Sequence, residues 1–82
     1  MNEYIACLRD TLSRLLDEAN ESVATATELN GHAGQAYELG RVEAFTNSLH
    51  TWKNQLETFG IGPELGDTWK ALNLFLQERE LP

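Results

Sequence analysis

The apolar residues of this chain recur at alternating steps of three and four, and this spacing restricts the fold more than any other feature. In the first 29 residues the repeating positions are Ile5, Leu8, Leu12, Leu15, Ala19 and Ala26, with Ser22 filling the remaining turn. Such spacing places the side chains on one side of an α-helix. The alternating pattern of a half-buried strand occurs nowhere in the sequence. The sequence therefore predicts an all-α fold.

Capping signals predict where the helices begin and end. The first helix is expected over residues 3–29, with Asn2 as its N-cap and the Asn-Gly pair that follows as its stop. A second helix is expected over residues 34–59 and ends at Gly60, a natural C-terminal glycine. Its apolar stripe consists of Val42, Phe45, Leu49, Trp52, Leu56 and Phe59.

A third, shorter helix is expected to start either at Pro63, as its first helical residue, or at Asp67, as its N-cap. Its inward positions are Leu65, Trp69, Leu72 and Leu76. Short connections favour antiparallel neighbours, so the first two helices are expected to form a hairpin. The third helix would fold back along the open end of this hairpin, beginning near residue 5. Residues 1–82 are interpreted as a single domain.

The chain is short for a stable core. With 82 residues, it buries only about 60% of the surface that its unfolded form exposes. Cys7 is the single cysteine and cannot form an internal disulfide, and no Cys/His cluster has the spacing of a structural metal site. Association with a second copy is the remaining source of stability. The sequence thus favours a homodimer, built as a dimeric helical bundle.

Two sets of residues are candidate dimer contacts. On a helical wheel, a face of small residues lies opposite the stripe of the second helix, with Tyr37 beside it; its members include Ala36, Gly40 and Ala44. A glycine inside a helix costs about 0.5–1 kcal/mol relative to alanine, so Gly40 indicates a close helix contact, a local helix break, or a glycine merely tolerated on an exposed surface. On the third helix, Leu74 points away from the apolar stripe and Phe75 lies at its edge.

An acidic line follows the outer side of the first helix and is a candidate partner-binding surface. Its members include Asp10, Asp17, Glu21 and Glu28. The formal net charge of the whole chain is −7, which disfavours direct binding to nucleic acid. One hypothesis is that the line mimics nucleic acid and occupies a basic groove of a DNA- or RNA-binding protein. The alternative is an ordinary solvated helix face.

The sequence offers little for catalysis. No zinc-protease spacing and no glycine-rich phosphate loop is present. His32 falls in the expected loop, and His50 has no acidic residue three or four positions away. No base stands near Cys7 in the sequence, so a nucleophilic role is not expected. The sequence predicts no cofactor and no metal.

Two short segments nevertheless form an enzyme alternative. The segments Leu15–Glu21 and Glu64–Asp67 resemble the paired carboxylate motifs with which all-helical nucleoside-triphosphate pyrophosphohydrolases hold magnesium. The resemblance implies Glu18, Glu21, Glu64 and Asp67 as metal ligands. A complete long helix separates the two pairs, where that family has a shorter connection. In the expected hairpin, Asp67 would lie on the order of 15–20 Å from Glu18.

The function that the sequence favours is a small acidic protein-interaction module, either a regulator, an adaptor or an inhibitor, without catalysis of its own. Its expected partners are another protein and a second copy, with no membrane and no direct nucleic acid. The first four residues carry an acid where a signal peptide would be basic, and no apolar segment follows. A cytoplasmic location is therefore expected.

Overall fold

A computed structural model describes residues 3–80 of the chain. The elements are α1 (Glu3–Glu28), α2 (Gln35–Thr58), the 3-10 helix η1 (Gly62–Leu65) and α3 (Asp67–Glu80). The prediction of an all-α fold is confirmed, and the described residues contain no strand. The expected cap at Asn2 lies outside the described residues.

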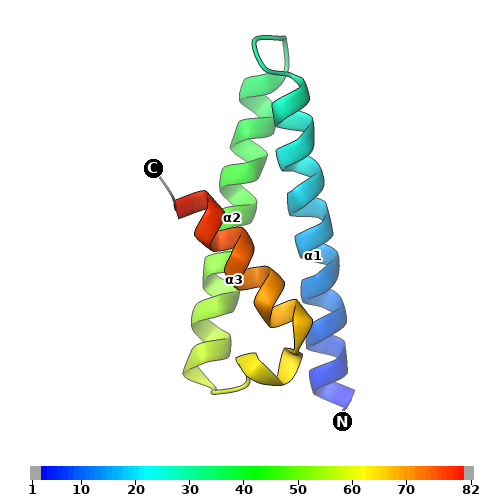
Figure 1. Cartoon of the computed structure of the whole chain (residues 1–82), viewed down its shortest axis with the longest axis vertical. Helices are drawn as coiled ribbons and strands as arrows, with labels where there is room; N and C mark the ends of the chain where they lie inside the picture. The colour runs from blue at the N-terminus through cyan, green and yellow to red at the C-terminus, as the bar shows by residue number, and fades with distance from the viewer. Residues whose placement is uncertain (1–2, 81–82) are drawn as a thin grey trace.

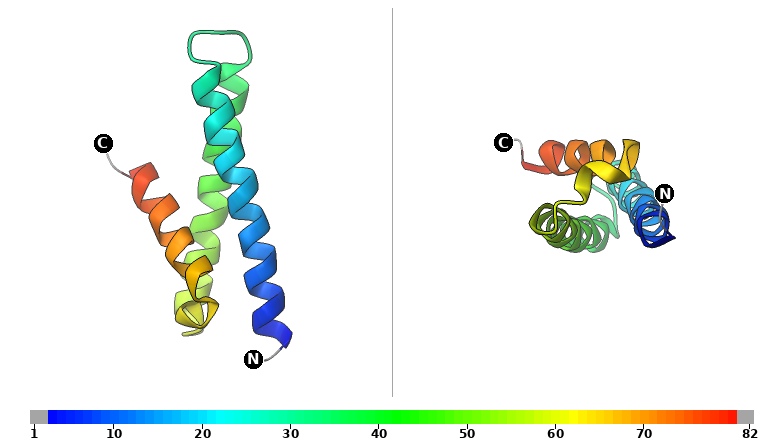
Figure 2. Two further views of the ribbon diagram at one scale, coloured as in Figure 1. Left: turned by 45° about the vertical axis from the view of Figure 1, so that its right-hand side comes forward. Right: turned by 90° about the horizontal axis from the view of Figure 1, so that it is seen from below.

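The three α-helices pack with α3 on one side of the other two. Helices α1 and α2 lie side by side, run in opposite directions and are joined by the loop at the top of Figure 1. Helix α3 contacts both of them, and it extends only over the half of the molecule that lies away from that loop (Figure 1). The end-on view in Figure 2 shows η1 and α3 on one side of the α1–α2 pair. No element of residues 3–80 covers the opposite side (Figure 2).

Glycines at positive φ end the long helices. Gly31 and Gly34, at φ 77° and 90°, turn the chain between α1 and α2. At the end of α2, the amide of Gly60 donates to the Glu57 carbonyl and the amide of Ile61 donates to the Leu56 carbonyl. With Gly60 at φ 70°, these two bonds form a Schellman motif, which satisfies the last carbonyls of the helix.

The third helix has Asp67 as its first helical residue and not as its N-cap, and a short 3-10 turn that starts one residue before Pro63 precedes it. Pro63 lies in the first turn of η1, and α3 begins at Asp67. The expected position of this start near residue 5 is wrong: Asp67 shares a groove with Ser13 and Asp17 of α1. The extra turn of η1, anchored by the buried Leu65, carries the chain along α1 before α3 begins.

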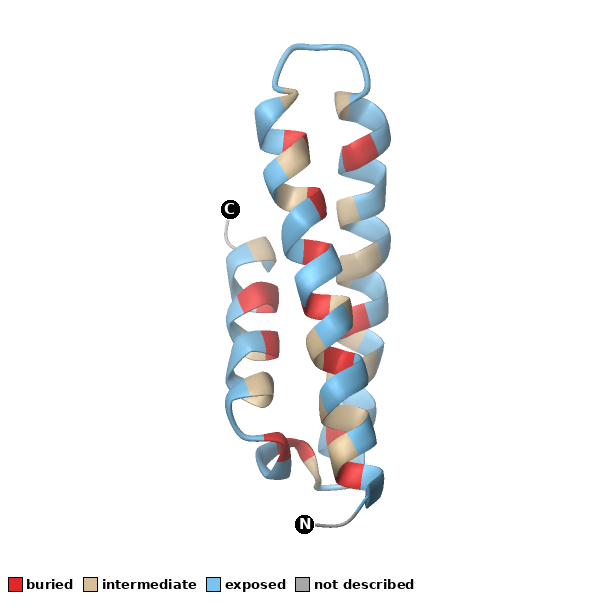
Figure 3. Cartoon of the chain, turned by 90° about the vertical axis from the view of Figure 1, so that its right-hand side faces the viewer, coloured by how far each residue is buried: buried red, intermediate tan, exposed pale blue. Residues whose placement is uncertain are grey.

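The apolar stripe predicted for α2 consists of two rows of side chains that are buried to different extents. Residues Val42, Leu49 and Leu56 are seven apart, and the two leucines are buried. The second row, Phe45, Trp52 and Phe59, is also seven apart but is only partly buried or exposed. On α1, Leu16 is more deeply buried than the predicted Leu15, because α1 faces both α2 and α3. Figure 3 shows buried positions recurring along α1 and on α3. The fully buried side chains of greatest volume are Leu12, Leu49, Leu65, Leu72 and Leu76.

Candidate functional site

An apolar groove lies at the end of the hairpin where α1 begins and α2 ends. It has a volume of about 320 Å³ and is lined by Leu8, Thr51, Trp52, Gln55, Leu56, Phe59 and Ile61. Phe59 is the C-cap residue of α2, and the turn at Gly60 brings Ile61 back to the same groove. Phe59 is 71% exposed and Tyr4, one turn before Leu8 on α1, is 81% exposed.

This groove belongs to a longer surface, which we call the back face and define by Tyr4, Leu8, Leu15, Phe45, Trp52 and Phe59. The back face points away from α3. This follows from helix geometry, because two residues nine positions apart in an α-helix point in opposite directions. His50 of α2 contacts Glu80 of α3, with 3.1 Å between Nε2 and Oε1. Phe59 follows His50 by nine residues, or two and a half helical turns, and so points in the opposite direction. Asp17 shares a groove with α3, and by the same spacing Leu8 points away from it.

The spacing along the back face is that of a helix–helix contact. On α1 the positions 4, 8, 11 and 15 alternate between steps of four and three, and on α2 the positions 45, 48, 52, 55 and 59 do the same. Such alternation keeps one line of side chains facing a neighbouring helix. Thr11, Ser48 and Gln55 are exposed polar or hydroxyl residues between the larger apolar ones. The hairpin therefore carries a regular row of apolar side chains on the side away from α3, and part of this row also packs against the core.

Toward the loop end, the same side of the molecule becomes charged. A groove of about 310 Å³ is lined by Glu18, Glu21, Ser22, Thr25 and Arg41. The Arg41 guanidinium donates from Nη1 to Oε1 of Glu38 at 3.3 Å and lies 5.9 Å from the ring centre of Phe45. Oε2 of Glu38 is buried without a hydrogen-bond partner among the described residues. Arg41 therefore sits among three carboxylates at the edge of the apolar back face.

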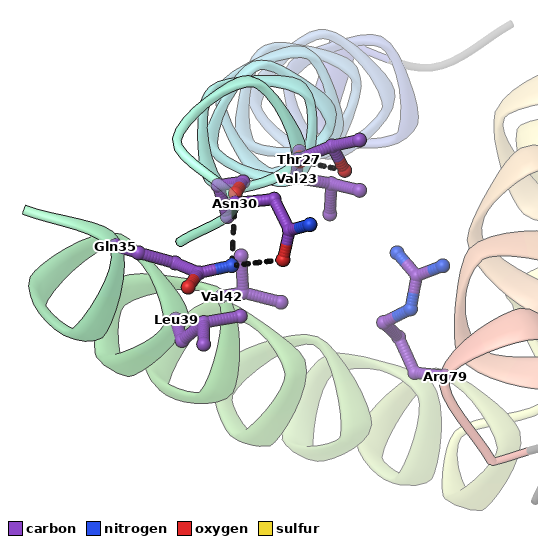
Figure 4. Close-up of a pocket in the computed structure, with 8 residues that line it drawn as sticks. Val23, Thr27, Asn30, Gln35, Leu39, Val42 and Arg79 are labelled. Carbon is purple, nitrogen blue, oxygen red and sulfur yellow. Dashed lines mark hydrogen bonds between the residues drawn. The ribbon is translucent and has the colours of Figure 1, made fainter. Parts of the chain in front are cut away.

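A further groove lies beside α3, where that helix ends (Figure 4). Its Gln35 side chain is held by hydrogen bonds within the chain. Gln35 Nε2 donates to the Ala26 carbonyl at 3.5 Å and to Oδ1 of Asn30 at 3.3 Å. The same side chain accepts a bond from the Gly31 amide. On the opposite wall, the guanidinium of Arg79 lies 5.2 Å from the Phe75 ring centre. We interpret the three hydrogen bonds of Gln35 as a clamp that holds the loop between α1 and α2 closed.

The predicted dimer contacts differ in their exposure: all of them are exposed except Phe75. Ala36, Tyr37, Gly40 and Ala44 are exposed. Helix α2 is continuous through Gly40, so the alternative of a local break is wrong. Apart from the backbone of α2 itself, no atom of residues 3–80 lies within 4 Å of the position that a Cβ at Gly40 would take. Leu74 is 58% exposed on the outer side of α3.

Phe75 is a correction: it is only 3% exposed and belongs to the core. The sequence placed it at the edge of the stripe of α3. Because α3 contacts both long helices, it buries a wider arc than a helix packed against one neighbour, and Phe75 falls within that arc.

The acidic line is exposed throughout, and its members have different surroundings. Asp10 forms an exposed ion pair with Arg14 at 3.3 Å. Asp17 lies beside α3, and Glu21 lies in the groove with Arg41. Glu28 is exposed at the last position of α1. Binding of a basic partner by these residues stays a prediction.

The carboxylates of the enzyme alternative are divided between two sides of the molecule. Glu18 and Glu21 line the groove with Arg41, whereas Asp67 shares a groove with Asp17 next to α3. Glu64 is exposed in η1. Within residues 3–80, no group of three or more His, Cys, Asp or Glu side chains has the arrangement of a metal site.

Three further findings bear on function. The contact between His50 and Glu80 was not predicted, because the acidic partner comes from α3 and has no sequence proximity to His50. No helix within residues 3–80 combines the length and the hydropathy needed to cross a lipid bilayer. Comparisons of the chain with models of protein families, with curated proteins and with solved structures find no match.

Proposed function

We propose that the chain is a small acidic protein-binding module, acting as a regulator, adaptor or inhibitor, which docks on another protein chain through its back face and performs no catalysis itself. Assembly of the hairpin into a dimeric helical bundle is one form of this function. The observation that supports the proposal is the apolar groove at the open end of the hairpin, flanked by the exposed Tyr4 and Phe59.

The apolar groove differs from scattered exposure of single apolar residues. A lone exposed leucine such as Leu74 needs no explanation, but adjoining apolar side chains that continue into a core mark an interaction surface. Trp52 and Leu8 both pack against the core and line the groove. Aromatic residues of this kind supply most of the binding energy at protein interfaces.

Site-specific photo-crosslinking tests the proposal. A benzophenone amino acid replaces Phe59 in one protein and Leu74 in a matched control, and both are irradiated in the cells that produce the chain. We expect covalent adducts to form from position 59 and not from position 74, because only the former lies on the back face. Equal adduct formation from both positions, or none from position 59, would contradict the proposal.

A further inference from the structure

The aromatic residues of the back face are spaced symmetrically along α2, and this spacing points to the kind of chain that binds there. We infer that the back face binds a second copy of this chain in antiparallel orientation, around a two-fold axis that passes beside Trp52. This inference rests on the proposed function and adds the identity and the register of the partner. Three observations support it: the spacing of the aromatic residues, the distribution of charge and the size of the face.

The spacing of the aromatic residues is symmetric about Trp52. Phe45 and Phe59 each lie seven residues from it, on opposite sides and in the same row of α2. A two-fold axis perpendicular to α2 at Trp52 brings Phe45 of one chain opposite Phe59 of its partner. The two tryptophans meet at the axis. A closed dimer requires a self-complementary surface of this kind.

The other helix fits the same axis. Leu8 of α1 lines the groove together with Gln55 of α2, so Trp52 is level with about residue 11 of α1. Leu8 and Leu15 then lie three and four residues from the axis, on opposite sides of it, so each comes close to the other's counterpart in the second chain, and Tyr4 lies one turn further out. The small side chains of Thr11 and Ser48 leave room between the larger ones. Two hairpins packed in this way form a four-helix bundle.

The charge distribution selects the antiparallel orientation. Residues 3–15 and 45–61, which carry the back face, contain three acidic side chains (Glu3, Asp10, Glu57) and three basic ones (Arg9, Arg14, Lys53). Residues 16–44, at the loop end, contain six acidic side chains and one basic one. A parallel dimer would place two loop ends of net charge −5 side by side, whereas the antiparallel dimer places them at opposite ends, beyond the screening length of about 8 Å at physiological salt.

The face is large enough for a dimer of moderate affinity. An aromatic side chain contributes about 150–250 Å² when buried, so the exposed parts of Tyr4 and Phe59 supply roughly 300 Å² per chain. With the partly exposed Leu8, Leu15, Phe45 and Trp52 and the exposed polar residues between them, the face approaches the roughly 600 Å² per chain, or about 1,200 Å² in the dimer, at which stable interfaces begin. This area lies at the lower end of stable interfaces. We therefore expect dissociation in the micromolar range.

Light scattering after size exclusion tests the identity of the partner. The full chain is loaded at concentrations from 1 to about 300 µM, a range chosen to bracket micromolar dissociation, and we expect the mass to rise from one chain to two. Phe59→Ser should raise the dissociation constant about thirty-fold, as truncation of an interface aromatic typically does. Leu74→Ser removes a comparably exposed residue from the outer side of α3 and should leave the mass unchanged.

Disulfide pairing tests the register, with Cys7→Ser as the background for all variants. In the antiparallel dimer, residue 48 of one chain lies opposite residue 56 of the other, next to Gln55. A mixture of Ser48→Cys and Gln55→Cys chains should therefore form a mixed disulfide on mild oxidation. Neither variant should pair with itself, since two copies of residue 48 would be about 12 Å apart along the axis and two copies of residue 55 about 9 Å. A disulfide needs Cβ atoms about 4 Å apart.

The outcomes separate this inference from the proposed function. A dimer that forms the mixed disulfide supports the inference, and a dimer that forms only the two self-paired disulfides, or none, contradicts the register. A single-chain mass at about 300 µM would overturn the inference, while crosslinks from position 59 to a different protein would still support the proposed function. A single-chain mass without any such crosslink would overturn both.

Discussion

Gly62 is the position where a single methyl group should have the largest effect on folding. It is buried at the first position of η1, and a Cβ at this residue would lie 2.7 Å from Cε2, Cζ2 and Cη2 of Trp69. Its φ is not in the left-handed region, so the backbone itself accepts alanine. The cost of Gly62→Ala therefore comes from moving the indole. Overpacking of this kind costs about 1–3 kcal/mol, against a total of only about 3–5 kcal/mol for a core of this size.

Thermal unfolding followed by circular dichroism measures this cost. For a domain of this length, 1 kcal/mol shifts Tm by about 4–8 °C, so Gly62→Ala should lower Tm by roughly 5–20 °C. Trp69→Phe removes the part of the ring that the methyl group would contact, and the alanine substitution should cost less in that background. A Tm for Gly62→Ala equal to that of wild type, or an equal loss in both backgrounds, would refute the steric argument.

Three further variants test other parts of the chain. Gly40→Ala should raise stability by about 0.5–1 kcal/mol in thermal unfolding, because Gly40 is inside a helix with open space around it; a loss of stability would instead indicate a tight contact there. Gln35→Ala should lower stability by about 1–2 kcal/mol, because the loop loses its clamp of three hydrogen bonds; denaturant titration measures it, and unchanged stability would show that the clamp is dispensable. Replacing Asp17, Glu21 and Glu28 together by Gln should raise Tm slightly at low salt, because Asp17 and Glu21 repel each other at a cost of a few tenths of a kcal/mol. A gain in Tm that persists at high salt would contradict this electrostatic cause.

The helices could be predicted from sequence because their signals are local. The expected bounds of 3–29 and 34–59 differ by one residue at most from α1 and α2, since glycine fixes where each helix ends. The position along α1 at which α3 begins could not be predicted. It depends on η1, whose four residues offer no periodicity and whose direction is set by burial of Leu65 and by the packing of Gly62 against Trp69.

The back face was present in the sequence pattern but was hidden within the stripe of α2. Phe45, Trp52 and Phe59 lie about 20–80° from Leu49 and Leu56 on a helical wheel, which is close enough to be counted as the same face. Only the position of α3 separates the two rows, by showing which side of the hairpin is covered. The sequence instead drew attention to Gly40, whose surroundings in the chain are open.

Dimerisation through the back face would also link the stability of the chain to its concentration. A partner that binds only the folded chain adds a stabilisation of RT ln(1 + [L]/Kd), or about 2.7 kcal/mol when the free partner is at one hundred times Kd. For a domain held by a few kcal/mol, such a contribution would be a large part of the total. The Tm of the wild-type chain should therefore rise with protein concentration. The Tm of Phe59→Ser should rise much less, and at low concentration it should match wild type, because this side chain is largely exposed in the single chain. A Tm of the wild-type chain that stays constant from 1 to about 300 µM would mean that the folded hairpin gains nothing from a second copy in this range.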